Sequence, residues 1–186
     1  SGSDETCICV RQGPVELHFE AWKGLDIMQS AGRIRHILAK YGGQDVDEVR
    51  VDVIGLGAGL LDRLRELGYN TREFNITQRS SDKQKWSRFW HEAWWTLKEM
   101  YERGEVVPRT GREFDDLMKI QLGNIHKRYD NSIHTMPEIE SKDQIKRRTG
   151  VSPDRAEAHM IAFVPLPKQE RRPTSALAYT KRKGRW

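Results

Sequence analysis

The stretch Val49-Arg50-Val51-Asp52-Val53-Ile54-Gly55-Leu56-Gly57-Ala58-Gly59 decides the fold class of this protein. Its first half alternates valines with other residues, as a β-strand does. Its second half is a glycine-rich turn, and an apolar stripe of helical spacing follows it. A strand, a tight turn and a helix in this order predict an α/β domain. The same order places the acidic side chain of Asp52 at the end of the strand.

The elements on either side of this stretch predict one domain, residues 1–167, with a mixed central sheet flanked by helices. Upstream, residues 7–11 and 15–22 flank Gly13-Pro14 as the strands of a hairpin. A helix should follow from Ile27 to Tyr41. Downstream we expect a helix that Gly68 closes, a strand at 71–76, helices at 83–103 and 113–122, a hairpin at 125–138 turning near Asn131, a basic helix at 142–148, and a last helix with Ser152 as N-cap, Pro153 as first helical residue and Phe163 near its end.

The long helix at 83–103 carries an aromatic stripe. Trp86, Trp90 and Trp94 recur every four residues, and Leu97 and Tyr101 continue the series. Aromatic rings between basic residues can stack on nucleic-acid bases. At this spacing, however, the stripe is more typical of a helix face that packs into the core.

Composition excludes several classes of protein. The 186 residues include six Trp, five Phe and five Tyr, enough apolar material for a core. No apolar run approaches the roughly 20 residues of a membrane span. Cys7 and Cys9 predict neither a disulfide framework nor a metal-ligand set, which favours a reducing compartment.

Positive charge is concentrated at the C-terminal end. Residues 168–186 hold seven Lys or Arg and one Glu, whereas the whole chain has a net charge of +5. This basic tail could contact nucleic acid or an acidic partner, or it could be a solvated terminus, and the sequence does not separate these alternatives.

The glycine turn does not match the fingerprints of nucleotide-binding proteins. A dinucleotide fold requires G-x-G-x-x-G, and here Leu60 stands where the third glycine belongs. The sequence also contains no G-x-x-x-x-G-K-[ST] phosphate loop. Asp52 would place negative charge beside a bound pyrophosphate, but it suits a metal ion. An Asp that pairs with a neighbouring Lys or caps a backbone group is an equal alternative.

A second acidic group lies in Ser152-Pro153-Asp154-Arg155-Ala156-Glu157-Ala158. Asp154 and Glu157 are three residues apart on the predicted helix and therefore share a face. Asp154 could simply complement the helix dipole. Glu157 sits among apolar residues, where a carboxylate is costly unless it is paired or binds a metal. Together with Asp52, the pair could bind hard cations such as Mg²⁺.

The run from Val51 to Leu64 resembles the nuclease domain of tailed-phage large terminases, a family with a ribonuclease-H-like fold. Further segments fit in the same order, covering most of residues 4–163: Glu92-Ala93-Trp94-Trp95, Ile139-Glu140-Ser141-Lys142-Asp143 and Ser152 to Ala158. The resemblance implies a metal-dependent endonuclease that cuts concatemeric double-stranded DNA during genome packaging, with two Mg²⁺ or Mn²⁺ ions. It implies metal ligation and catalysis by Asp52, Asp154 and Glu157, and DNA contacts by Lys142, Lys146, Arg147 and Arg148.

The resemblance also implies partners and a location. The family's ATPase motor precedes this domain, and the basic tail could reach the small terminase subunit or the portal of the procapsid. No membrane is involved, and the place of action would be the host cytoplasm.

Two positions depart from the family pattern. Gly2-Ser3-Asp4-Glu5-Thr6 resembles a segment that follows the family's opening strand, so the first metal-binding Asp would fall before residue 1. Asp4 could partly replace it. Glu157 stands where many members have Asp. Two other functions therefore remain open: a non-catalytic DNA- or capsid-docking module, and a nucleotide-cofactor domain that uses the glycine turn.

Overall fold

A computed structural model describes residues 5–54, 57–107, 116–128 and 136–167. The helices are α1 (Ile27–Leu38), α2 (Gly57–Glu66), α3 (Phe89–Glu102), α4 (Asp116–Gly123), α5 (Lys142–Thr149) and α6 (Asp154–Phe163), with the short 3-10 helices η1 (Ala39–Tyr41) and η2 (Gly43–Asp45). The strands are β1 (Thr6–Gln12), β2 (Val15–Trp22), β3 (Val49–Asp52), β4 (Thr71–Phe74), β5 (Lys127–Arg128) and β6 (Glu138–Ile139).

The strands associate in pairs. β1 and β2 form the antiparallel hairpin that the sequence predicts. β3 and β4 are parallel, with Asp52 opposite Phe74, and α2 forms the crossover that a parallel pair requires. β5 and β6 are antiparallel and pair at Lys127 and Ile139, as the predicted hairpin requires, but the second strand lies later than predicted.

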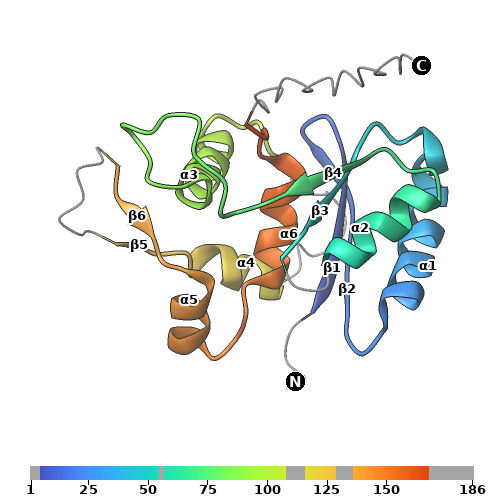
Figure 1. Ribbon diagram of the computed structural model, residues 1–186. Coiled ribbons are helices and arrows are strands. Elements are labelled where there is room, and N and C mark those ends of the chain that lie inside the picture. Colours follow the sequence, from blue (N-terminus) through green and yellow to red (C-terminus); the bar gives the residue numbers. More distant parts are fainter. Residues whose placement is uncertain (1–4, 55–56, 108–115, 129–135, 168–186) are drawn as a thin grey trace, which may run out of the picture.

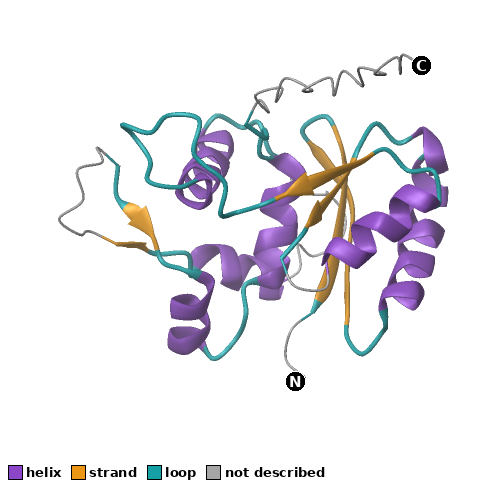
Figure 2. Ribbon diagram, viewed as in Figure 1, coloured by secondary structure: helices purple, strands orange, loops and turns teal. Residues whose placement is uncertain are grey.

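Helices cover both sides of these strands (Figures 1 and 2). α1 and α2 pack beside β1 and β3, around a core that includes Trp22, Val51 and Leu64. On the other side α6 packs against β1 and β3, and a second core joins it to α3. The predicted α/β class is therefore confirmed.

The central sheet differs from the prediction in one respect. Within the described residues, no backbone hydrogen bond joins β1 to β3, so the predicted mixed sheet is divided into two pairs. A cleft of about 1160 Å³ separates them, and residues of both strands line it. Asp52, Asp154 and Glu157 also line this cleft.

The aromatic stripe is a core face, as its spacing predicts. Trp86, Trp90, Trp94 and Leu97 are all buried. The helix starts later than predicted, at Phe89. Asp82 explains the difference, because its side chain accepts hydrogen bonds from the backbone N–H groups of the two residues at 84 and 85 and so holds a separate turn.

The start of α6 also corrects the sequence-based prediction. Pro153, not Ser152, is the N-cap, and Asp154 is the first helical residue. The Ser152 hydroxyl donates instead to the Asp154 carboxylate, at 2.6 Å. Ser152 therefore orients a candidate site residue rather than capping the helix.

Several predictions fall outside the described residues. These are Asp4, the turn near Asn131 and the basic tail at 168–186. In the part of the chain that is described, no helix is both long and apolar enough to span a membrane.

Candidate functional site

Three carboxylates from two elements meet at the cleft between β1 and β3. Asp52 ends β3, Asp154 begins α6, and Glu157 follows one helical turn later. All three line the cleft, together with Lys142 at the start of α5. The structure thus places the three acidic residues that the sequence singled out on the lining of one cleft, although their ligand atoms do not all lie within 4.8 Å of one another.

The glycine turn sets the position of Asp52. A Cβ atom added to Gly57 would lie 1.6 Å from the Asp52 carbonyl oxygen, which no side chain can tolerate. Glycine is therefore required so that α2 can start directly against the end of β3. The Asp52 carboxylate accepts a hydrogen bond from the Ile54 N–H at 3.1 Å. Burial raises its pKa, and the charge of Asp154 adds to the rise.

Asp154 is held by donors from three segments. One oxygen accepts from the Glu5 backbone N–H at 2.9 Å, and the other accepts from the Ser152 hydroxyl. The Lys142 ammonium lies 2.8 Å from that second oxygen. The side chain is 9% exposed. These contacts fix the carboxylate at the cleft wall without rotational freedom.

Glu157 shares the lysine with Asp154. The Lys142 Nζ lies 2.6 Å from Glu157 Oε2. Burial raises the pKa of Glu157 to about 7, and the neighbouring Asp154 and Asp52 contribute to the rise while Lys142 opposes it. Burial lowers the pKa of Lys142, but the two carboxylates outweigh it and raise that pKa above its usual value.

The residues present fit a divalent cation. Glu157 Oε1 is buried and has no hydrogen-bond partner among the described residues. Such an orphaned oxygen is expensive to bury unless something binds it. The donor set consists of carboxylate oxygens, which Mg²⁺ and Mn²⁺ prefer. Lys142 supplies positive charge at this position when no ion is bound.

Comparison with known proteins identifies the fold. No protein-family model and no curated protein sequence matches the chain. The nuclease domain of the large terminase subunit gp2 of bacterial virus Sf6 superimposes with a TM-score of 0.74 at 16% identity, covering 89% of this chain and 85% of that domain. The large terminase nuclease from thermophilic phage G20c, with bound magnesium, superimposes with a TM-score of 0.59 at 17% identity. The match covers 86% of this chain and 74% of that chain.

This chain has the fold of a phage terminase nuclease domain. A mutant Sf6 nuclease domain with manganese also superimposes, with a TM-score of 0.70 at 16% identity over 83% of this chain and 80% of that domain. The predicted resemblance is therefore supported by the three-dimensional structure, and the ribonuclease-H-like fold class is confirmed.

The four basic residues predicted to contact DNA lie in different surroundings within this terminase nuclease fold. Lys142 pairs with two carboxylates, as described above. Arg148 forms an ion pair with Glu140 at 2.7 Å and donates to the Asn124 carbonyl, so its guanidinium ties α5 to its neighbours. Lys146 is half-buried, and Arg147 is exposed near the end of the same helix.

Sequence reasoning missed one group of residues. Cys9, Glu16 and His159 lie close together although Cys9 and His159 are 150 positions apart, and their donor atoms have the spacing of a possible metal site. Nothing in the sequence places Cys9 among metal ligands, and the spacing alone does not test that expectation. No short motif connects these three positions, and only the packing of α6 against the hairpin brings them together.

Proposed function

We propose that this chain is the metal-dependent endonuclease domain of a phage large terminase, which cuts concatemeric double-stranded DNA during genome packaging. The observation that carries the proposal is that Asp52, Asp154 and Glu157 line one cleft, in a fold shared with terminase nuclease domains. One of those domains is described with bound magnesium and another with manganese.

Asp52 and Asp154 would hold two divalent ions, with Glu157 as a further ligand. Ions bound there would supply an activated water for in-line attack and stabilise the leaving 3′ oxygen. The chain's own residues prepare this position. Ser152 and the Glu5 N–H orient Asp154, the Gly57 turn orients Asp52, and burial keeps the Glu157 carboxylate close to its neighbours.

Lys142 would leave the two carboxylates when an ion binds. Its ammonium contacts one oxygen of Asp154 and one of Glu157, so a cation that binds the same oxygens competes with it. Its side chain is 37% exposed, and the released ammonium could then turn toward a DNA phosphate.

DNA would be held mainly through its phosphates. Arg147 is the strongest candidate of the basic helix, because its side chain is exposed and lies five residues beyond Lys142. The ATPase motor in the same full-length protein, the small terminase subunit and the portal are the proposed partners. The place of action would be the cytoplasm of the infected host.

Cleavage of supercoiled plasmid DNA in Mn²⁺ tests the proposal. The parent chain should nick the plasmid, and Asp52→Ala should not. Asp62→Asn is a matched control, because Asp62 is an exposed acid on α2 that pairs only with Arg65 among the contacts described. Equal cutting by the parent and Asp52→Ala would show that Asp52 is not a metal ligand.

A binding-only module is the second candidate function. The observation that favours it is that Lys142 already forms ion pairs with two of the three carboxylates. This alternative predicts that the chain retains DNA on a filter but leaves the plasmid intact at every Mn²⁺ concentration.

A further inference from the structure

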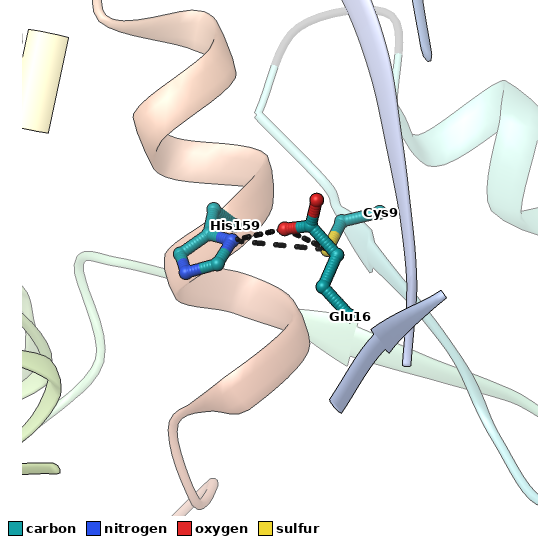
Figure 3. Close-up of side chains that lie close together, drawn as sticks. All are labelled: Cys9, Glu16 and His159. Atoms are coloured by element: carbon teal, nitrogen blue, oxygen red, sulfur yellow. Dashed lines mark hydrogen bonds and ion pairs between the residues drawn. The ribbon is translucent and has the colours of Figure 1, made fainter. Parts of the chain in front are cut away.

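We propose that Cys9, Glu16 and His159 form a second metal site, which binds a borderline-soft ion such as Zn²⁺ and is separate from the carboxylate site. The three side chains come from β1, β2 and α6 and point toward one another (Figure 3). His159 is fully buried, Glu16 is 5% exposed and Cys9 is half-buried. The proposal does not depend on the nuclease function.

The distances between the three donor atoms suit a zinc ion. Glu16 Oε2 lies 2.8 Å from His159 Nδ1 and 3.7 Å from Cys9 Sγ, and Sγ lies 4.0 Å from Nδ1. Three atoms with these separations lie on a circle with a radius of about 2.1 Å, close to the usual zinc–nitrogen and zinc–oxygen bond lengths. An ion at its centre would reach all three donors with only small shifts, and water could provide a fourth ligand.

The surroundings of His159 are those of a metal ligand. Its Nε2 lies 2.6 Å from the Tyr101 hydroxyl, and its ring packs 4.7 Å from that of Phe163. A metal-bound histidine normally uses its second ring nitrogen in such a hydrogen bond, which fixes the ring and leaves the first nitrogen for the metal. Tyr101 would hold Nδ1 in this orientation.

The donor set selects a different ion from the one that suits Asp52 and Asp154. A thiolate and an imidazole favour zinc and similar transition ions, whereas carboxylate oxygens favour Mg²⁺ and Mn²⁺. Binding would release the Cys9 thiol proton, because the thiolate is the ligand. Cys9 also lines the cleft between β1 and β3, which offers the ion a route to the site.

The two sites lie on different sides of α6. Glu157 and His159 are two residues apart, which corresponds to about 200° around a helix. A zinc ion at the second site would connect both strands of the hairpin to α6, five residues after Asp154. It would thereby fix the helix that carries two of the three proposed metal-binding carboxylates.

Cobalt substitution tests this site directly. One equivalent of Co²⁺ added to the metal-free chain should give an intense near-ultraviolet band from sulfur-to-cobalt charge transfer. Cys9→Ser should lose the band completely, whereas Cys7→Ser should keep it, because Cys7 lies on the same strand but outside the cluster. Asp52→Asn should also keep it, which separates this result from the nuclease proposal.

A second measurement uses the unmodified chain, so its result does not depend on whether the variants fold. Iodoacetamide followed by peptide mass spectrometry should label Cys9 slowly when one equivalent of Zn²⁺ is present and faster after a chelator removes the zinc. Absence of the cobalt band in the parent, its persistence in Cys9→Ser, or equal labelling of Cys9 with and without zinc would overturn the proposal.

Discussion

Helix α6 presents two different sets of donor atoms on two of its sides. On the cleft side, Asp154 and Glu157 offer oxygen atoms, and both pair with Lys142. On the hairpin side, His159 meets one carboxylate and one thiol. One helix would thus serve hard and borderline ions at once under the two proposals, because its neighbours, rather than the helix itself, complete each donor set.

The largest effect is expected from Asp154→Asn, which removes the charge of the residue at the centre of the oxygen site. The rate of Mn²⁺-dependent plasmid cleavage should fall by more than about 100-fold. Losing a residue that only supports a metal ligand already lowers activity by up to about that factor, and Asp154 is proposed as a ligand itself. The sulfur-to-cobalt band should be unchanged, because His159 faces the other side of the helix. Loss of both signals would mean that the two sites are not independent.

Gly57→Ala should disturb the oxygen site through the backbone. The added methyl group cannot coexist with the Asp52 carbonyl, so α2 or the end of β3 must move. We expect a loss of about 1–3 kcal/mol in the free energy of unfolding, as for other overpacked positions, with reduced cleavage. Urea denaturation measures this loss in the free energy of unfolding.

Gly32→Ala is the control for that experiment. Gly32 lies within α1, and a Cβ added there meets nothing within 4 Å. This variant should be unchanged or more stable by about 0.5–1 kcal/mol, because alanine favours helix. Equal destabilisation of both variants would contradict the close contact proposed between α2 and Asp52.

The pH dependence of stability should change in Glu157→Gln. Because the pKa of Glu157 is raised to about 7 in the folded state, the folded chain keeps a proton that the unfolded chain releases near its ordinary value of 4.5. This group's contribution to the free energy of unfolding is therefore lost as the pH rises through that range. In the absence of metal, the free energy of unfolding of the glutamine variant should rise relative to that of the parent by about 1–3 kcal/mol between pH 5 and pH 8.

Thermal denaturation at pH 5, 6, 7 and 8 measures this difference between the two proteins. Glu66→Gln is the control, because Glu66 is an exposed residue at the end of α2. A difference that does not vary with pH would contradict the raised pKa of Glu157.

The smallest effect is expected from Arg147→Ala. Loss of one phosphate contact should weaken DNA binding several-fold without regard to sequence, and it should reduce the slope of log affinity against log salt by about 1. Fluorescence anisotropy at several salt concentrations measures both. Arg103→Ala should leave them unchanged, since Arg103 is engaged by Glu99 and Glu105. An unaltered salt slope in Arg147→Ala would exclude this residue from the DNA surface.

The sequence singles out Asp52, Asp154 and Glu157 because each belongs to a local pattern, and their binding of metal stays a prediction. Asp52 ends an alternating strand before a glycine turn, and Asp154 and Glu157 follow a proline that starts a helix. Each position can be assigned from its immediate neighbours, and only their convergence requires the fold. The role of Lys142 was less predictable, because a basic residue on a basic helix looks like a phosphate contact until its two carboxylate partners are seen.

The second site shows the limit of such reasoning. Cys9 and Glu16 are brought together by the hairpin register, but His159 reaches them only through packing of α6, 143 residues after Glu16. The helix at 83–103 illustrates a smaller limit. The four-residue spacing of its aromatic residues includes Trp86, and Trp86 is buried as that spacing predicts. The side chain of Asp82 stabilises a separate turn there, so Trp86 is not part of the helix.

A crystal of the chain soaked in Mn²⁺ would reveal directly whether these carboxylates bind metal. We expect anomalous manganese density between Asp52 and Asp154, within bonding distance of their carboxylates, with the Lys142 ammonium displaced. No manganese at these carboxylates, or manganese density only at Cys9, Glu16 and His159, would contradict this expectation.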